Sequence, residues 1–516
     1  MKENAPDTHG RRTFLRRSAK AALGARVGAT LLPLAGCDKG GRASSSQSAN
    51  AARAASASFT PDVERRLVAG PMAVEVPGRS GGRPWKTWGY GGQYPGPEIR
   101  VKEGERLRVV VENDLPGGAG TTVHWHGVPV PNAMDGVPGL TQQPIPTGET
   151  FAYEFEASPA GTYMYHSHAG LQLDRGLIGP LIIEERTPHV EYDREHTLLL
   201  DDFLPGPPRP LETLAESDGE SGGMMNRDGR GGMMGGCGMM GGGIVPSYEG
   251  LMVNGRLPGA PPSFEVREGE RVRLRLINPS SATTFHLALA GHRLTVTHAD
   301  GRPVEPVTVD SLRVGMGERY SVIVEAGNPG AHTFMARPVE GDATPARAIL
   351  RYRGVRRNRP PEGEVPQGLR GGRRLRYADL QSVETPLGQT GGGEPGRTFD
   401  LRLSRGRMMG GMMGGDDGGR TWTIGGQAYP NADPLEVSEG ERVRFRMTNH
   451  SMMLHPMHLH GHFFQVGNAL KDTVLVDGHM GREQLTFAAD HPGDWFFHCH
   501  NLYHLEAGMA RAIRYA

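Results

Sequence analysis

The sequence has few cysteines, no excess of charge of either sign and no long apolar run beyond its N-terminus. Only three of its 516 residues are cysteine, Cys37, Cys237 and Cys499, which excludes a small scaffold held together by disulfides. Lys plus Arg and Asp plus Glu both number 57, so the net charge is zero, which argues against a nucleic-acid-binding protein. No run of eighteen apolar residues follows the N-terminus, which excludes a protein with several membrane-spanning helices.

The N-terminal residues resemble a bacterial export signal. Arg11 and Arg12 precede a weakly apolar stretch over residues 19–35, as in twin-arginine (Tat) signals, which export folded proteins. The stretch leads to Leu-Ala-Gly and then Cys37, which resembles a lipobox with a lipidated cysteine. The alternative is a chance cysteine at an ordinary cleavage site. We expect a signal peptide over residues 1–36 and a flexible tether over residues 37–58. The lipid on Cys37 would hold the protein to a membrane surface, in the periplasm or elsewhere outside the cytoplasm.

Three similar units follow along the chain. Each contains the phrase Glu-Gly-Glu-Arg, then a segment that alternates apolar and charged residues, and then an asparagine. The phrases lie at residues 103–106, 268–271 and 439–442, and the asparagines are Asn113, Asn278 and Asn449. Alternation with a period of two predicts half-buried strands. A repeat of this length, about 165 residues, predicts an all-β chain of three β-sandwich domains.

The repeat also suggests where each domain begins and ends. We expect domains over residues 59–188, 189–355 and 396–516, with a connector over residues 356–395 that is rich in Arg, Pro and Gly. The middle unit has Phe285-His286-Leu287 but no His-x-His pair, which favours a spacer role for this domain.

Ten of the 21 histidines fall into four short groups. The groups are His124 and His126; His166 and His168; His455, His458 and His460; and His498, His500 and His504. Because side chains on a strand alternate between its two faces, each His-x-His pair presents both imidazoles on one face. In the fourth group, Cys499 then points away from His498 and His500. A metal bound by Cys499 is joined through a few covalent bonds to metals bound by its neighbours.

The third and fourth groups, with Cys499 and Met509, also contain the ligands of a blue-copper site. A thiolate, two imidazoles and a weak thioether are the ligand set of such electron-transfer sites. Cys499, His455 and His504 supply the strong ligands and Met509 the axial one. A single His-x-His pair more often consists of ordinary histidines, but four groups together favour metal binding. Zinc is the alternative metal, although a structural zinc site does not explain the remaining histidines.

These groups, together with residues 94–99 (Tyr-Pro-Gly-Pro-Glu-Ile), resemble the multicopper oxidase family in its three-domain, laccase-like form. The resemblance covers residues 65–516. It implies three cupredoxin-like Greek-key domains and four copper ions, with the first and last domains facing each other. The implied ligands are His455, Cys499, His504 and Met509 for type 1 copper; His124 and His458 for type 2; and His126, His166 and His500, with His168, His460 and His498, for the two type 3 ions.

The resemblance also implies a reaction. Type 1 copper takes single electrons from a reductant, Cys499 passes them through His498 and His500 to the trinuclear cluster, and the cluster reduces O₂ to two waters. Asp135, in Met-Asp-Gly-Val, resembles the acid that relays protons near the cluster in this family. An ordinary Asp-Gly turn is the alternative.

Two segments are extreme in methionine and glycine. The methionines are Met224, Met225, Met233, Met234, Met239 and Met240 in the first segment, and Met408, Met409, Met412 and Met413 in the second. Glycine cannot build a core around them, and thioether sulfur is a soft ligand suited to Cu(I), so copper capture is favoured over an idle low-complexity insertion. Cys237 is either a further Cu(I) ligand or an incidental thiol. The segments, and the sequence around Met452 and Met453, resemble the copper-resistance branch of the family, the CopA and CueO-like oxidases.

The resulting hypothesis is a cuprous oxidase that converts Cu(I) to the less permeant Cu(II) in copper resistance. Its partners would be O₂ and a reducing substrate, and we expect a monomer. One alternative is a general laccase acting on phenols and aromatic amines. The other is a copper-sequestering protein that is not an enzyme.

Overall fold

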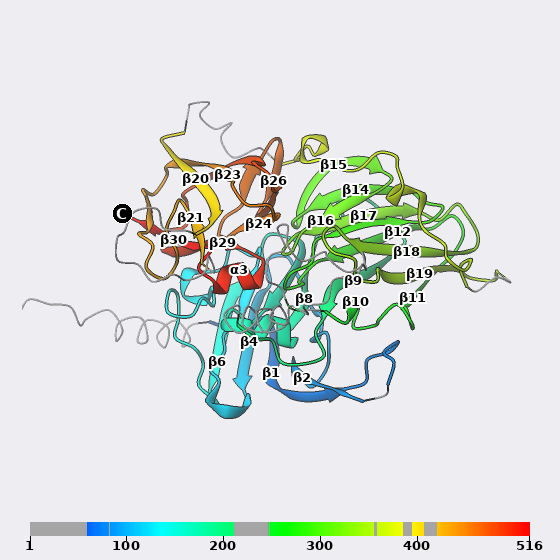
Figure 1. Cartoon of the computed structure of the whole chain (residues 1–516), viewed down its shortest axis with the longest axis horizontal. Helices are drawn as coiled ribbons and strands as arrows, with labels where there is room; N and C mark the ends of the chain where they lie inside the picture. The colour runs from blue at the N-terminus through cyan, green and yellow to red at the C-terminus, as the bar shows by residue number, and fades with distance from the viewer. Residues whose placement is uncertain are drawn as a thin grey trace, which may run out of the picture. The chain divides into compact units, whose positions relative to one another are not determined.

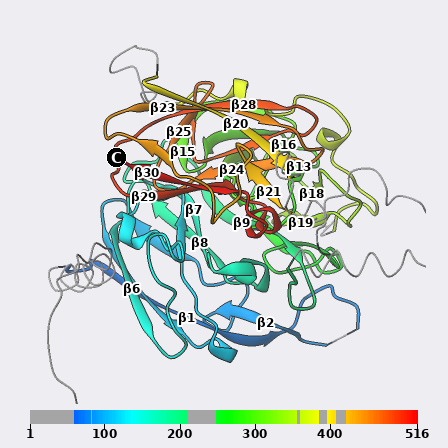
Figure 2. The same cartoon turned by 60° about the vertical axis from the view of Figure 1, so that its left-hand side comes forward.

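Six β-sheets in three pairs contain most of the regular structure (Figures 1 and 2). The computed structural model describes residues 59–81, 83–210, 246, 248–355, 359–384, 395–406 and 421–516, all within one compact unit. Each pair of sheets is built from one of the three sequence repeats, which confirms the predicted all-β chain of three two-sheet domains. Cys37, Cys237, both methionine-rich segments and the predicted signal and tether lie outside the described residues. The predicted domain boundaries stay predictions.

The first domain, blue to cyan in Figure 1, contains two four-stranded sheets. One sheet consists, in spatial order, of β2 (Trp85–Tyr90), β1 (Val63–Val74), β4 (Arg106–Asn113) and β6 (Thr150–Glu156). The other consists of β3 (Ile99–Lys102), β8 (Ile178–Glu184), β7 (Gly161–His166) and β5 (His124–His126).

The second domain, green in Figure 1, has sheets of six and five strands. The first sheet is β10 (Gly250–Val253), β9 (Arg194–Phe203), β12 (Arg271–Ile277), β17 (Arg319–Glu325), β14 (Leu294–Ala299) and β15 (Arg302–Val309). The second is β11 (Ser263–Val266), β19 (Ala346–Tyr352), β18 (Ala331–Pro338), β13 (Phe285–Leu289) and β16 (Leu312–Val314).

The third domain, yellow to red in Figure 1, repeats this arrangement. Its first sheet is β21 (Trp422–Ile424), β20 (Arg397–Arg405), β23 (Arg442–Asn449), β28 (Arg482–Ala488), β25 (Phe464–Val466) and β26 (Ala469–Lys471). Its second is β22 (Leu435–Val437), β30 (Ala510–Tyr515), β29 (Asp494–Cys499), β24 (His455–Leu459) and β27 (Thr473–Val476).

Among the described residues, helical structure is confined to short segments between strands. The 3-10 helices are η1 (Pro116–Gly118), η2 (Asn132–Met134), η3 (Gly170–Arg175), η4 (Gln367–Leu369) and η5 (Tyr377–Asp379), and the α-helix is α3 (Leu502–Glu506). None of the helices in the described ranges is long and apolar enough to cross a membrane.

The three domains share one topology. In each, the first strand pairs in parallel with the strand that follows the Glu-Gly-Glu-Arg phrase, as in β1 with β4, β9 with β12 and β20 with β23. The glycine of the phrase forms the turn before that strand with a positive φ, +82° at Gly104, +86° at Gly269 and +80° at Gly440, a conformation that favours glycine. The sequence repeat is therefore a repeat of one chain path.

The asparagine that ends each repeat ties loops together. Asn113, Asn278 and Asn449 are fully buried. The side-chain amide of Asn278 donates to the carbonyls of Thr283 and Val314, at 2.9 Å each, and its Oδ1 accepts from the Ser280 amide at 3.0 Å. The same pattern joins Asn113 to Ala119, Ile145 and Leu115, and Asn449 to Met453, Val476 and Ser451.

One predicted half-buried strand differs from its counterparts. Strands β4 and β23 alternate between buried and less buried residues, whereas β12 is buried on both faces from Val272 onward. The outer face of β12 meets the first domain, where Arg275 donates to Thr162 Oγ1 at 2.8 Å. Arg273 on the same face pairs with Glu185 at 2.6 Å, so charged residues that alternation places in solvent are buried in an interface.

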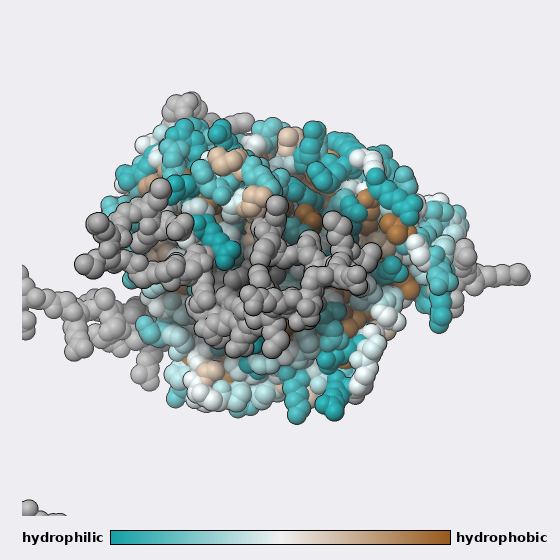
Figure 3. All heavy atoms as spheres, in the orientation of Figure 1, coloured by the Kyte–Doolittle hydropathy of each residue, from teal (hydrophilic) through white to brown (hydrophobic). Residues whose placement is uncertain are grey.

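Each domain has its own hydrophobic core. Trp125, between two histidines of β5, is fully buried in the first core, and Cys499 lies in the third. The described surface shown in Figure 3 is mainly hydrophilic. Alternation therefore places Trp125 in a core and frees its histidine neighbours for the opposite face.

Replacing Asn278 with Ala should destabilise the middle domain without affecting any predicted metal ligand. The change leaves buried backbone groups without partners, which costs about 1–3 kcal/mol. Urea unfolding measures the loss, and the matched control is Asn328→Ala, an exposed position in the same domain. Equal stability of the two variants would contradict the role assigned to the buried asparagine.

Candidate metal centre

Eight of the predicted histidines meet where the first and third domains face each other. Four come from β5, β7 and the residues after β7, and four from β24, β29 and the residues that follow them. They are His124, His126, His166, His168, His458, His460, His498 and His500. Seven of the eight are buried and His168 is half-buried. The arrangement follows from strand pairing, because His124 lies opposite His166 in one sheet and His458 opposite His498 in the other.

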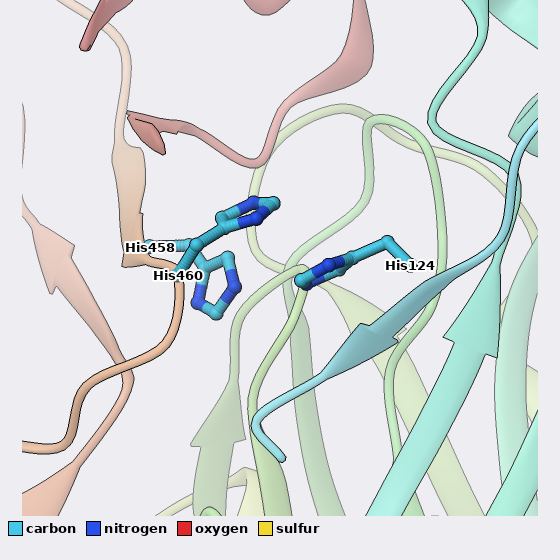
Figure 4. Close-up of side chains that lie close together, drawn as sticks. All are labelled: His124, His458 and His460. Carbon is cyan, nitrogen blue, oxygen red and sulfur yellow. The ribbon is translucent and has the colours of Figure 1, made fainter. Parts of the chain in front are cut away.

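Pairs of rings stack across the domain boundary. The ring centroids of His124 and His460 are 3.8 Å apart, as are those of His126 and His458. Figure 4 shows the rings of His458 and His460 directed toward His124. Potential ligand atoms lie within 4.8 Å of one another in three sets: His124 with His458 and His460; His124 with His126 and His166; and His168 with His460 and His498. The ring of His500 is 4.8 Å from that of His126 and 5.3 Å from that of His166.

The hydrogen bonds of these histidines fix which nitrogen is free. Nδ1 of His124 bonds the Asp135 carbonyl at 2.8 Å, and Nδ1 of His458 bonds the Asp472 carbonyl at 2.9 Å. A carbonyl only accepts, so each Nδ1 carries the hydrogen and each Nε2 keeps its lone pair. Nε2 of both residues and of His166 is buried with no hydrogen-bond partner among the described residues. Buried lone pairs without partners, turned toward one point, are what a metal ion requires.

Burial keeps the imidazoles neutral. Burial, and then the charge that neighbouring histidines would carry, lowers the pKa of His460, His498 and His500 well below the usual value. The same two causes lower the pKa of His166 and His168. Only neutral imidazole coordinates metal, so the site is prepared for metal at neutral pH.

Two buried carboxylates flank the cluster. Asp135 Oδ2 lies 3.0 Å from His460 Nδ1, and its Oδ1 lies 3.2 Å from His124 Nδ1. Asp472 Oδ1 lies 3.4 Å from His126 Nε2 and 3.5 Å from His458 Nδ1. Each carboxylate therefore contacts one histidine from the first domain and one from the third. Asp135 has the contacts that the predicted proton relay requires, and Asp472 is an addition that the sequence motifs did not indicate.

A second site lies beside the first. His455, Cys499 and His504 form another candidate ligand set, and all three are buried. Cys499 Sγ is 3.6 Å from Nδ1 of each histidine, and the two Nδ1 atoms are 3.1 Å apart. Met509 is fully buried, and its carbonyl accepts from the Cys499 amide at 3.0 Å. Asn501 caps α3 by accepting from the amides of Tyr503 and His504, which fixes the position of His504.

The chemistry of this second donor set fits copper. Burial raises the pKa of the Cys499 thiol well above its usual value, so the thiol ionises when a metal replaces its proton. One thiolate, two imidazoles and a thioether together suit a copper electron-transfer site, and a closed zinc site rarely combines them. Cys499 lies between His498 and His500 in sequence, so the two sites are joined through the main chain of β29 and the residue after it.

Two residues that contact the histidines of the second site are not predicted from the sequence. The ring of Trp422 lies 4.1 Å from that of His504 and 5.0 Å from that of His455. Ser451 Oγ lies 2.8 Å from His455 Nε2. Trp422 is distant in sequence from both histidines, so no motif or spacing could indicate its position.

Comparisons with known proteins agree with this geometry. Three family models, each described as multicopper oxidase, match residues 76–188, 196–355 and 405–516. The multicopper oxidase MmcO of Mycobacterium tuberculosis is 37% identical, over 90% of this chain and 87% of that protein. Copper resistance protein A of Escherichia coli is 29% identical, over 87% of this chain and 92% of that protein.

Solved structures show the same fold. The laccase of Botrytis aclada superposes with a TM-score of 0.70 at 26% identity, over 88% of each chain. The multicopper oxidase Fet3p, described as functioning in iron import, superposes with a TM-score of 0.73 at 21% identity, over 88% of this chain and 90% of that chain. The predicted cupredoxin-like architecture is confirmed.

Copper-free protein should lose stability as the pH falls below about 6.5. Burial lowers the pKa of His455 to about 3 and that of His462 to about 4. These groups stay neutral in the fold, while the unfolded chain takes up protons below about pH 6.5. The free energy of unfolding is therefore unaffected by these two groups above about pH 6.5. Below that pH it falls by up to about 1.4 kcal/mol per pH unit for each group, until the pH reaches the pKa of that group in the fold.

Urea unfolding at about pH 7.5 and about pH 5 tests this expectation. Copper-loaded protein is the control and should unfold at higher urea concentrations at both values, because bound metal stabilises only the folded state. A copper-free stability that is unchanged between the two pH values would show that the buried histidines do not govern the acid sensitivity.

Proposed function

The chain belongs to the multicopper oxidase family, and on that premise we propose that its reducing substrate is Cu(I), oxidised outside the cytoplasm in copper resistance. Members of the family are copper-dependent oxidoreductases that use O₂ and a reducing substrate. The balanced reaction converts four Cu(I), one O₂ and four protons into four Cu(II) and two waters. The observation that carries the proposal is a pair of exposed methionines beside the Cys499 site.

We further propose four resident copper ions, with ligands that follow the geometry above. Type 1 copper is held by His455, Cys499, His504 and Met509, and type 2 copper by His124 and His458. The type 3 ions are held by His126, His166 and His500, and by His168, His460 and His498. The free Nε2 atoms of His124 and His458 support the type 2 site. The mutual distances of His168, His460 and His498 support one type 3 site.

Bound copper supplies the one-electron steps and the reduction of O₂. The chain's own residues hold and connect the sites. Cys499 joins the type 1 ligands to His498 and His500 through the main chain, which gives electrons a short covalent path. The carboxylate of Asp135, at 3.0 Å from His460 Nδ1, orients that ring and can hold a proton beside the place where water forms. The surrounding core excludes water from Cys499.

The exposed methionines favour Cu(I) over an organic donor. Met452 and Met480 are 54% and 51% exposed, although methionine usually lies in a core. Ser451, next to Met452, contacts His455 Nε2 at 2.8 Å, and its carbonyl accepts from the His479 amide at 2.9 Å. Soft thioether ligands at the surface, one residue from a contact of the type 1 site, suit capture of Cu(I).

Both methionine-rich segments lie near residues of the type 1 region in the sequence. Trp422, which packs on His504, lies nine residues after Met413. Tyr248 lies eight residues after Met240, and its hydroxyl is 3.4 Å from Asp174, which also accepts a hydrogen bond from Tyr503 in α3. These positions in the sequence support a role of both segments in supplying Cu(I) to the type 1 site. The relatives named for copper resistance support the same role.

Export and attachment complete the proposal. The twin arginines and Cys37 support Tat export and a lipid anchor at a membrane surface. A lipid-anchored monomer outside the cytoplasm would meet Cu(I) where copper resistance requires its oxidation. Mass spectrometry of the mature protein would detect a lipid on Cys37, and an unmodified cysteine or an earlier cleavage would contradict the anchor.

O₂ uptake with Cu(I) as the only donor tests the substrate. The intact protein is compared with a chain lacking residues 224–240 and 408–413 and with a Met452→Leu, Met480→Leu double variant. We expect Cu(I) oxidation to fall at least tenfold, equivalent to about 1.4 kcal/mol, while oxidation of a simple phenol is retained. Equal Cu(I) rates in all three proteins would indicate a general laccase. Copper far above four ions per chain with negligible O₂ uptake would indicate sequestration.

Replacing Asp135 with Asn should slow O₂ reduction about 10–100-fold. The amide keeps the size of the carboxylate, but it cannot hold the proton, and the type 1 ligands are unaffected. Steady-state O₂ uptake measures the loss, and the blue absorption of type 1 copper should persist. Asp400→Asn, at an exposed position in the third domain, is the control. An unchanged turnover number in Asp135→Asn would remove the proton relay from the mechanism.

A further inference from the structure

We propose that the middle domain positions the ligands of the trinuclear cluster through Arg319, which clamps Asp472 between His126 and His458. The sequence suggests only a spacer role for this domain. Its Arg319 nevertheless reaches the boundary between the other two domains, where the cluster lies. The side-chain hydrogen bonds of Arg319 go to Asp472, Gly317 and Thr162, so it acts on the ligands through Asp472 and is a positioning residue.

The clamp is a buried, two-pronged ion pair. Arg319 is the first residue of β17 and is fully buried. Its Nη1 donates to Asp472 Oδ1 at 2.7 Å and its Nη2 to Asp472 Oδ2 at 2.6 Å. The planar guanidinium matches both carboxylate oxygens at once, which fixes the orientation of the carboxylate as well as its charge. Lysine has the charge without this planar fork.

Asp472 determines how His126 is presented to the cluster. His126 Nε2 faces Thr473 Oγ1 at 3.3 Å and Asp472 Oδ1 at 3.4 Å, so its hydrogen belongs on Nε2. Its Nδ1 is buried without a hydrogen-bond partner in the described parts of the chain. His124 and His458 have the opposite arrangement, with Nδ1 bonded and Nε2 free. The carboxylate that Arg319 holds therefore favours, at His126, the tautomer opposite to that of His124 and His458.

The middle domain holds the residues around Asp472 as well. Asp300 Oδ2 accepts from the amides of Asp472 and Thr473 at 3.3 and 3.2 Å. Lys471 Nζ pairs with Asp300 at 2.9 Å and with Glu318 at 3.0 Å, and all of these groups are buried. Three consecutive residues of the third domain are thus held by carboxylates of the second.

The turn before Arg319 lies directly against the ligands. Gly317 has a φ of +86°, and a Cβ added there would lie 3.0 Å from His126 Cε1 and 3.0 Å from His500 Cδ2. The Gly317 carbonyl accepts from Arg319 Nη1 at 2.9 Å, so one turn both orients the guanidinium and contacts two rings. The position of Arg319 and the position of the rings are therefore coupled through the backbone.

Removal of the clamp should affect the proposed type 2 and type 3 sites and leave the proposed type 1 site unchanged. Without Arg319, Asp472 is a buried carboxylate that has lost the two donors that fix its orientation, and its side chain can turn away from His126 and His458. This change alters the positions of His126 and His458, which belong to the proposed type 3 and type 2 sites. The type 1 ligands do not contact Asp472, so their spectrum should stay as it is. The inference rests on the proposed copper ligands.

The test compares three variants of the full, copper-loaded chain. Arg319→Met removes the fork, Arg319→Lys keeps the charge, and Arg275→Met is the matched control. Arg275 is also buried in the middle domain and ion-paired with Glu195 at 2.8 Å, and it donates to Thr162, but neither partner is a proposed copper ligand. Copper per chain, the electron paramagnetic resonance spectrum of type 2 copper, the blue type 1 absorption and the thermal midpoint are measured for each.

We expect Arg319→Met to bind type 2 copper at least tenfold more weakly, with a changed resonance spectrum and normal blue absorption. Arg319→Lys should fold and retain more copper than Arg319→Met, but its type 2 spectrum should still differ from that of the wild-type protein. If Arg319→Met does not fold, the type 2 spectrum of Arg319→Lys tests the clamp. Arg275→Met should lower the thermal midpoint and leave copper content and spectra unchanged.

Wild-type copper content and type 2 spectra in both Arg319 variants would overturn the clamp. Equal loss of type 2 copper in Arg275→Met would also overturn it, because general loosening of the middle domain would then be the cause. Wild-type protein that shows no type 2 signal would overturn the proposed ligand assignment, and the clamp with it. A wild-type protein with all four ions and unaffected variants would leave the proposed function intact and remove only the clamp.

Discussion

The two-residue alternation of strand β29 is the constraint on which both metal sites depend. A strand turns successive side chains to opposite faces, so Cys499 points into the core of its own domain while His498 and His500 point toward the first domain. The two faces have different surroundings. One is a hydrophobic core that suits a thiolate shielded from water, and the other is a polar boundary that can collect eight imidazoles. One short segment thereby joins the two candidate metal sites.

Because the histidines come from two domains, the boundary between those domains is part of the candidate metal site. The ligands come from two domains, so errors in the docking of those domains become errors in ligand position. Hydrophobic contacts are tolerant of small shifts, whereas ion pairs with two parallel hydrogen bonds are not. The buried charges at the boundary, Arg319, Lys471, Asp300, Asp472 and Glu318, satisfy one another across the second and third domains. Burying them is costly unless every partner is in place, which favours a single docked arrangement.

The sequence predicts most of the potential ligands in the candidate metal sites and few of the residues that support them. His124, Cys499 and the other ligands occur in local groups, where strand alternation alone places the side chains together. The three domains are predicted from a phrase that recurs because each copy needs the same turn and the same buried asparagine. Asp472 and Arg319 lie 153 residues apart and share no motif, so only the folded chain brings them together. The two-sided burial of β12 depends on domain docking, which alternation within one strand cannot indicate.

The middle domain has the same frame without a pair of histidines on the equivalent strand. Strands β5, β13 and β24 occupy equivalent places in their domains. In β5 the order is histidine, tryptophan, histidine, with the apolar ring in the core. In β13 it is Phe285, His286 and Leu287, with the two apolar residues in the core and the histidine less buried. A shift of one residue in the alternation exchanges the faces of a strand, so β13 presents one histidine where β5 presents two. With no ligands to present, this domain is free to contribute Arg319, Gly317 and Asp300 to the boundary that the other two domains share.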